Sequence, residues 1–157
     1  MKKRIIILTM SDKHTGYCVA GIDCETGKWI RLLSDDRQTE GAVPNKWLYY
    51  QDGSRIQIYD VIECELLCPV PTNVQPENWL YDARVKWEKV GTSNKAEVWA
   101  LHGSDNPEYV FVNTERRLEA DTIFRGEPSL ITVSGDAGML CSKKFSGKNI
   151  STIEFCI

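Results

Sequence analysis

Four side chains in the first forty residues are of the types that bind nucleic acids. Lys13 and His14 lie in a short polar turn that begins at Ser11, and Trp29 and Arg31 follow two residues apart. In an extended strand that spacing is about 6–7 Å and puts both side chains on one face. An indole can stack on a base while nearby cations hold phosphates. We therefore predict a ligand-binding surface here. The alternative is a solvated turn beside an amphipathic strand whose Trp29 packs on the protein.

A second group of polar residues follows a proline-rich segment. Gln75, Glu77, Asn78 and Trp79 occur within five positions. Asn and Gln amides can pair with adenine, and a Glu carboxylate can accept from cytosine. The same groups can instead cap a turn and fasten two segments together. We predict that Gln75 and Asn78 contact the ligand, with structural capping as the alternative.

Catalysis has little support in the sequence. His14 and Cys18 could act as base and nucleophile, but no third group that would orient them is identifiable. The sequence contains no glycine-rich phosphate loop, no Gly-x-Ser-x-Gly and no His-Glu-x-x-His. We expect a non-catalytic protein with no cofactor and no metal. A small hydrolase that acts on a nucleotide or nucleic acid through His14 is the less favoured alternative.

Composition and charge restrict the compartment and the partners. The 157 residues are 42% hydrophobic and 26% charged, which is typical of a globular chain. The net charge is −3 and no segment is a basic block, so any nucleic-acid contact depends on a few local cations and on stacking. The longest aliphatic run, Ile5–Leu8, is too short for a membrane span or a secretion signal. Six cysteines without a Cys-x-x-Cys are expected to be reduced thiols in the cytoplasm.

The elements that position these residues have the period of β-strands. Strands are predicted at Lys3–Met10, Tyr17–Asp23 and Lys28–Ser34. In the third, Ile30 and Leu32 share one face, and Trp29, Arg31 and Leu33 share the other. A longer strand over Arg55–Cys68 is predicted to place on one face Ile56, Ile58, Ile62, Cys64 and Leu66, with Asp60 as an exception and a bulge at Tyr59–Val61. Prolines 69, 71 and 76 end the pairing and mark a boundary near residue 70.

The second half repeats the pattern of short strands. One helix is predicted at Thr114–Phe124. Strands are predicted at Arg84–Val90, Glu97–Leu101, Tyr109–Val112, Ser129–Val133, Met139–Phe145 and Ile150–Ile157. Five strands in roughly 70–80 residues is the size of an OB barrel. The sequence therefore predicts an all-β protein of two tandem small OB-like barrels, residues 1–70 and 71–157, packed as one compact unit with one short helix in the second half.

Three stretches resemble the dual OB-containing domain proteins of bacteria and their mobile elements. Ile6–Gly21 has an aliphatic strand, a polar turn ending in Lys-His, and then Cys-Val-Ala-Gly; Thr26–Arg31 reads Thr-Gly-Lys-Trp-Ile-Arg; Pro69–Leu80 contains Pro-Val-Pro and Gln-Pro-Glu-Asn-Trp-Leu. Leu32 and Leu33 stand where the family usually has a proline-containing step. The resemblance implies two tandem OB folds and, by association with that fold, binding of nucleic acid or nucleotide.

The leading hypothesis is a cytoplasmic binding module with no membrane association. Its first barrel would bind single-stranded DNA, RNA or a nucleotide, with Trp29 as stacking platform, Lys13 and Arg31 on phosphates and His14 on a base edge. The rival is a protein–protein adaptor that docks its partner through an acidic middle segment and the aromatic side chains of Trp47, Tyr49 and Tyr50.

Overall fold

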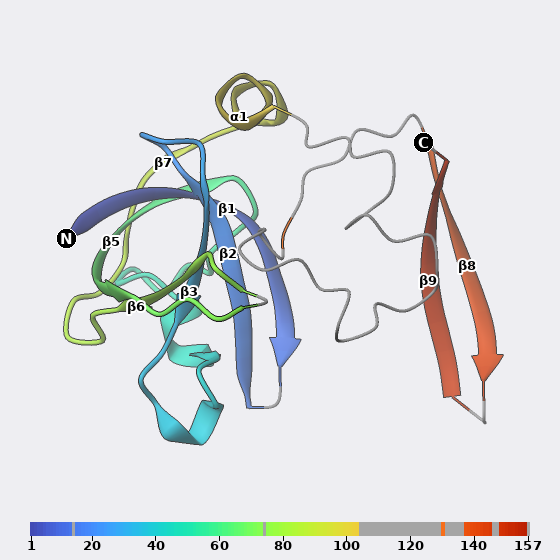
Figure 1. Ribbon diagram of the computed structural model, residues 1–157, viewed down its shortest axis with the longest axis horizontal. Coiled ribbons are helices and arrows are strands. Elements are labelled where there is room, and N and C mark those ends of the chain that lie inside the picture. The colour runs from blue at the N-terminus through green and yellow to red at the C-terminus, as the bar shows by residue number, and fades with distance from the viewer. Residues whose placement is uncertain (14, 74, 104–129, 131–136, 146–147, 157) are drawn as a thin grey trace. The chain divides into compact units, whose positions relative to one another are not determined.

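A computed structural model describes residues 1–13, 15–73, 75–103, 130, 137–145 and 148–156. The chain divides into two units (Figure 1). The first contains every described residue up to Gly103 together with Leu130. The second contains an antiparallel pair of strands, β8 (Ala137–Phe145) and β9 (Lys148–Cys156).

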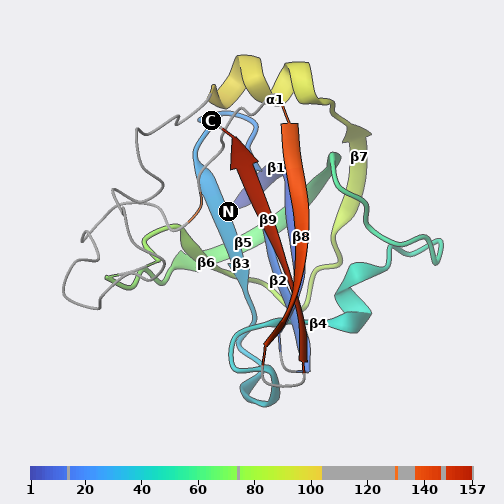
Figure 2. The same ribbon diagram turned by 90° about the vertical axis from the view of Figure 1, so that its right-hand side faces the viewer.

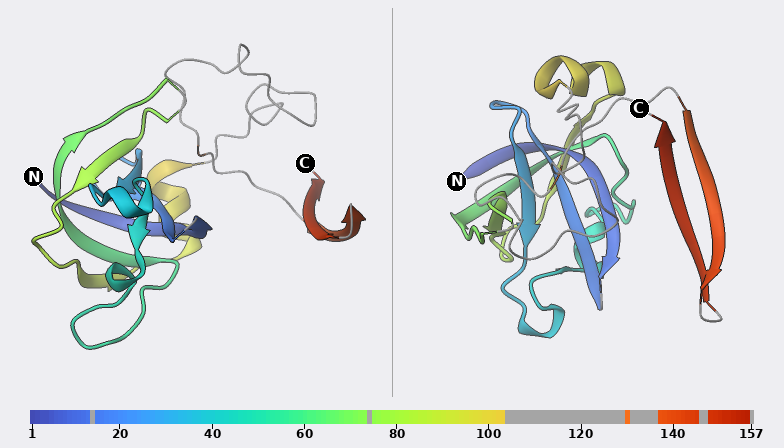
Figure 3. Two further views of the ribbon diagram at one scale, coloured as in Figure 1. Left: turned by 90° about the horizontal axis from the view of Figure 1, so that it is seen from below. Right: turned by 45° about the vertical axis from the view of Figure 1, so that its right-hand side comes forward.

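Five strands of the first unit close into a barrel, which Figure 2 and Figure 3 show from further sides. They are β1 (Lys2–Lys13), β2 (Gly16–Asp23), β3 (Trp29–Leu33), β5 (Asp60–Pro69) and β6 (Asn78–Tyr81). The pairing order is β1-β2-β3-β6-β5, and β5 also pairs with β1, which closes the ring. All of these pairs are antiparallel except β3 with β6. Two short strands lie outside the ring: β4 (Val43–Pro44) pairs with β2, and β7 (Glu88–Thr92) with β5.

Alternate residues of these strands fill the barrel interior. The buried cluster takes Ile5 and Ile7 from β1, Val19 from β2, Ile30 and Leu32 from β3, and Ile62, Cys64 and Leu66 from β5. The shared faces predicted for Ile30 with Leu32, and for Ile62, Cys64 and Leu66, are therefore confirmed, because side chains of a strand point alternately to its two sides.

Ile58 was predicted to face the same interior, and that prediction is wrong. Its side chain is 42% exposed. The chain is not yet in strand conformation there, since Tyr59 has a left-handed φ of 72° and β5 begins only at Asp60. The bulge predicted at Tyr59–Val61 corresponds to a real irregularity. The register between β5 and β7 shifts between Val61 and Ile62.

Asp60, the exception in the predicted pattern, is a buried carboxylate with several partners. It is 1% exposed, and its Oδ2 accepts from the Tyr50 hydroxyl and from the backbone N–H of Gln57, each at 2.9 Å. Its Oδ1 is paired with the ammonium group of Lys89. Burial by itself raises the pKa of Asp60, but the contacts with Lys89, Gln57 and Tyr50 outweigh it and leave the pKa below its ordinary value. Asp60 thus holds the start of β5 in place.

The chain between β3 and β5 covers one end of the barrel. It forms two short 3-10 helices, η1 (Arg37–Thr39) and η2 (Asn45–Leu48). Trp47 of η2 is 6% exposed and packs against Tyr81 and Trp87, with ring centroids 5.2 and 5.6 Å away. Trp47 is therefore a core residue and not the docking surface proposed for it, because this segment folds inward. Tyr50 is half-buried, whereas Tyr49 is exposed.

One segment predicted as a strand is helical. Residues 97–101 belong to α1 (Lys95–His102), at one end of the barrel in Figure 2. The Asn94 side chain accepts from the Glu97 N–H at 3.1 Å, and Gly103 ends the helix with a φ of 78°. Both signals stand in the sequence, where an Asn precedes a Glu by three residues and a Gly follows. Among the described residues, no helix is long and apolar enough to cross a membrane.

The second predicted barrel stays a prediction. The strands β8 and β9 match those expected at Met139–Phe145 and Ile150–Ile157. The strand expected at Arg84–Val90 is found a few residues later, as β7. The strand at 109–112 and the helix at 114–124 fall outside the described residues, as does all but residue 130 of the strand at 129–133. The first barrel takes β6 from beyond residue 70, so it includes residues on both sides of the expected boundary.

Candidate functional site

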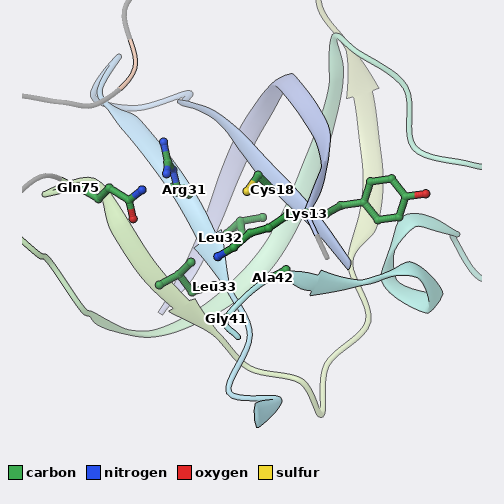
Figure 4. Close-up of a pocket in the computed structure, with 9 residues that line it drawn as sticks. Lys13, Cys18, Arg31, Leu32, Leu33, Gly41, Ala42 and Gln75 are labelled. Atoms are coloured by element: carbon green, nitrogen blue, oxygen red, sulfur yellow. The ribbon is translucent and has the colours of Figure 1, made fainter. Parts of the chain in front are cut away.

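A small pocket of about 100 Å³ opens beside the outer face of β2 and β3 (Figure 4). It brings together two predicted cations, Lys13 and Arg31, and the predicted amide Gln75. These three residues come from the end of β1, from β3 and from the segment that leads into β6. The described residues that line it are Lys13, Tyr17, Cys18, Arg31, Leu32, Leu33, Gly41, Ala42 and Gln75.

Strand alternation and a close approach of the backbone place these groups. Arg31 lies between Ile30 and Leu32, which point into the barrel, so its own side chain points outward. Lys13 pairs with Gly16 at the end of the β1–β2 hairpin. A Cβ at Gly16 would lie 2.8 Å from the Val43 carbonyl oxygen, so the absence of a side chain lets β4 pair with β2. That pairing brings the neighbouring Gly41–Ala42 segment to the pocket.

Arg31 is held by a buried carboxylate. Its Nη2 lies 3.3 Å from Oε1 of Glu77, and the two side chains are only 14% and 3% exposed. The Arg31 backbone N–H also donates to the Glu77 carbonyl at 2.9 Å. Because burying an unpaired charge is costly, the pair fixes the guanidinium at the edge of the pocket. Together the two side chains carry no net charge, so the net positive charge here comes from Lys13.

Lys13 and Gln75 are each oriented by one hydrogen bond. The half-buried Lys13 ammonium donates to the Glu40 carbonyl at 3.2 Å, which leaves two of its three N–H groups for a ligand. Gln75 Oε1 accepts from Asn78 Nδ2 at 3.2 Å. With that oxygen engaged, the Nε2 donor is the end of the Gln75 amide that can reach the pocket. Asn78 is 2% exposed and contacts Gln75 rather than lining the pocket itself.

The structure does not bring Trp29 to this pocket. The half-buried indole packs at the other end of the outer face, in a cluster with Ile6, Ile22 and Val98 of α1. Its Nε1 is buried and has no hydrogen-bond partner among the described residues. The ring of His102 meets the indole edge-on at 5.8 Å, and its Nδ1 lies 2.6 Å from the Gly27 carbonyl. The helix thus covers this end of the sheet, and the indole supports α1.

Ser11 is not among the described residues that line the pocket. The polar turn predicted to begin at Ser11 starts later, because β1 continues to Lys13. Ser11 is exposed on β1, opposite Cys18 of β2. His14 falls outside the described residues. In the part of the chain that the structure describes, no group of three or more His, Cys, Asp or Glu side chains gathers to hold a metal ion.

Sequence reasoning missed several residues of the site. Alternation along β2 could have placed Cys18 on the outer face with Ala20, two positions further on. Leu33 had been placed on the face of Arg31, but no binding role was given to it. For Glu77 the sequence suggested contact with a base edge or capping of a turn. Its ion pair with Arg31 joins residues more than forty positions apart, and no pattern in the sequence predicts it. Gly41 reaches the pocket only through the folding of the loop, where it has a φ of 82°.

The barrel belongs to a known class. A small closed barrel of five strands, of which the first pairs with both the second and the fourth, is an OB barrel. Proteins of this fold bind ligands on the face of barrel strands 2 and 3 and on the loops joining strands 1 to 2 and 4 to 5. Here those elements are β2, β3, the turn after Lys13 and the segment between β5 and β6. The described lining residues include members of β2, of β3 and of the segment between β5 and β6, together with Lys13, which directly precedes the turn.

The comparison with family models agrees with this fold. The chain belongs to the dual OB-containing domain family, whose model matches residues 3–155. The resemblance drawn from the three sequence stretches is therefore confirmed. Comparison with curated proteins and with solved structures returns no match.

Proposed function

We propose that this protein is a non-catalytic binding module whose first barrel takes single-stranded DNA, RNA or a nucleotide at the pocket beside β2 and β3. One observation carries the proposal: Lys13, Arg31 and Gln75 come from three separate segments and line one pocket. That pocket lies on the part of an OB barrel that serves for binding in other proteins of this fold.

The chemistry of the three side chains favours phosphate as the bound group. Lys and Arg offer only N–H donors, and phosphate oxygens only accept. With Glu77 included, the net charge of the pocket groups is +1, which suits one nucleotide phosphate. Few phosphates would be contacted in this way. We therefore expect weak binding that falls with salt at a slope of roughly −0.7 to −1.4 in log K against log salt concentration for single strands.

The test is fluorescence anisotropy with labelled DNA and RNA of about 12 nucleotides, within the site sizes of OB barrels. Losing one charge-assisted hydrogen bond costs roughly 1.5–3 kcal/mol, so Lys13→Ala should weaken binding about tenfold or more. Lys28→Ala is the matched control, because Lys28 is an exposed cation in the connection between β2 and β3 and is not among the described residues that line the pocket. Absence of binding tighter than about 100 μM at low salt, or equal loss in both variants, would refute the proposal.

A further inference from the structure

The size of the pocket limits what can enter it. Its volume of about 100 Å³ is well below the roughly 300–1,000 Å³ of sites that enclose a drug-sized ligand. A whole nucleotide therefore cannot be enclosed, but a single small group can. The group that enters must match the donors of Lys13, Arg31 and Gln75.

The polar side chains of the pocket select an anion over a base. Lys13 and Arg31 are donors only, and Gln75 has its oxygen turned to Asn78. No Asp or Glu is among the described residues that line the pocket, and Glu77 is paired with Arg31. A base edge offers a mixture of donors and acceptors, so the donors of Lys13, Arg31 and Gln75 suit it poorly. Phosphate oxygens match all three of these donors.

The enclosure favours a phosphate at the end of a chain. The lining comes from the β1–β2 hairpin, from β3, from Gly41–Ala42 and from the segment at Gln75, which lie on different sides of the pocket (Figure 4). An internal phosphodiester needs room for the strand on both sides of its phosphorus. A terminal phosphate has one ester bond, three unesterified oxygens and a charge of about −1.5 to −2. It can enter from one direction and present all three oxygens.

We infer that the pocket binds a terminal phosphate, the phosphomonoester at the end of a strand or of a nucleotide. This inference rests on the proposed function and narrows it, since it specifies which phosphate of the ligand is recognised. Lys13 supplies the net positive charge, the Arg31 guanidinium donates to a second oxygen, and Gln75 Nε2 donates to a third. The remainder of the ligand then lies outside the pocket.

The experiment compares oligonucleotides of one sequence that carry an internal fluorophore and differ only in their ends. Each end is tested with a hydroxyl and with a phosphate. We expect that, for at least one of the two ends, the phosphorylated oligonucleotide binds with an affinity about tenfold higher, or more, than the hydroxyl form. One added charge-assisted hydrogen bond is enough for this difference. A nucleoside monophosphate should compete with that oligonucleotide, and the 3′,5′-cyclic nucleotide, which is a diester, should not.

Gln75→Glu is the sharpest variant. It keeps the shape and the oxygen that accepts from Asn78, but it replaces the Nε2 donor by a carboxylate oxygen. The preference for a phosphorylated end should be lost in Gln75→Glu and kept in Lys28→Ala. If the 5′ and 3′ ends bind equally well with a hydroxyl and with a phosphate, and binding still depends on Lys13, this inference is overturned and the proposed function stands. No binding of any oligonucleotide or nucleotide would overturn both.

Discussion

Removing the carboxylate behind Arg31 should cost much of the stability of the barrel. In Glu77→Gln the shape is retained, but the Arg31 guanidinium, 14% exposed, loses its counter-charge at 3.3 Å. Breaking a buried ion pair by changing one partner costs about 3–5 kcal/mol, and we expect a value near 3 because Arg31 reaches the surface. With an m-value of about 2 kcal/mol/M, the urea midpoint should fall by about 1.5 M.

The assay is urea unfolding followed by tryptophan fluorescence, to which the buried Trp47 and Trp87 contribute. Arg31→Met should destabilise by a similar amount, because it leaves the Glu77 carboxylate buried without its partner. In the double variant Arg31→Met with Glu77→Gln, both charges are absent, and the cost should be well below the sum of the costs of Arg31→Met and Glu77→Gln. Lys2→Gln breaks an exposed pair and serves as the control, with little change expected. Additive single effects, or an unchanged midpoint for Glu77→Gln, would refute the role given to this pair.

Three further outcomes are expected. The lowered pKa of Asp60 means that its contribution to stability is present above the unfolded value of 3.8 and is lost as the pH falls through the folded value. The urea midpoint should therefore decrease below about pH 5, and this decrease should be smaller in Asp60→Asn. A Cβ at Gly21 would overlap a carbonyl oxygen of β1, so Gly21→Ala should yield no soluble folded protein. Gly53→Ala, with open space but a φ of 81°, should cost only about 1–2 kcal/mol; equal solubility of both variants would contradict this. Burial raises the pKa of the Cys64 thiol to about 12, so at about pH 8 a thiol reagent should label the exposed Cys68 and spare Cys64 in the folded protein, as peptide mass spectrometry can verify.

Local patterns were sufficient to predict most of the first barrel. The strands around Ile5, Val19 and Ile30 were predicted close to their observed bounds, although β1 continues past Met10 to Lys13. Short apolar runs bounded by turn residues are typical of strands. Prediction failed where two local signals competed. Residues 98–101 form a short apolar run of strand length, but Asn94 and Gly103 provide both ends of a helix. There the capping groups and packing on Ile6 and Ile22 decide the structure.

The candidate site was only partly predictable. Lys13, Arg31 and Gln75 were identified by their chemistry, and the fold does bring them together. Trp29 was predicted to lie on the binding surface because it shares a strand face with Arg31. The alternation of side chains along β3 does not indicate which other elements pack on that face. The helix α1 packs on Trp29, and its residues Val98 and His102 lie more than sixty positions after Trp29 in the chain.

Within β3 and β5 the sequence by itself determined which side chains share the face toward the barrel interior, since that follows from the two-residue period of a strand. The same period failed at Ile58, which precedes β5. The sequence also determined the family, through short stretches of characteristic residues. Only the tertiary structure decided which outward side chains become neighbours. The parallel pairing of β3 with β6 sets Glu77 against Arg31, and the folding of the loop after β3 brings Gly41 to Lys13. Such contacts join residues far apart in the chain, and no local pattern encodes them.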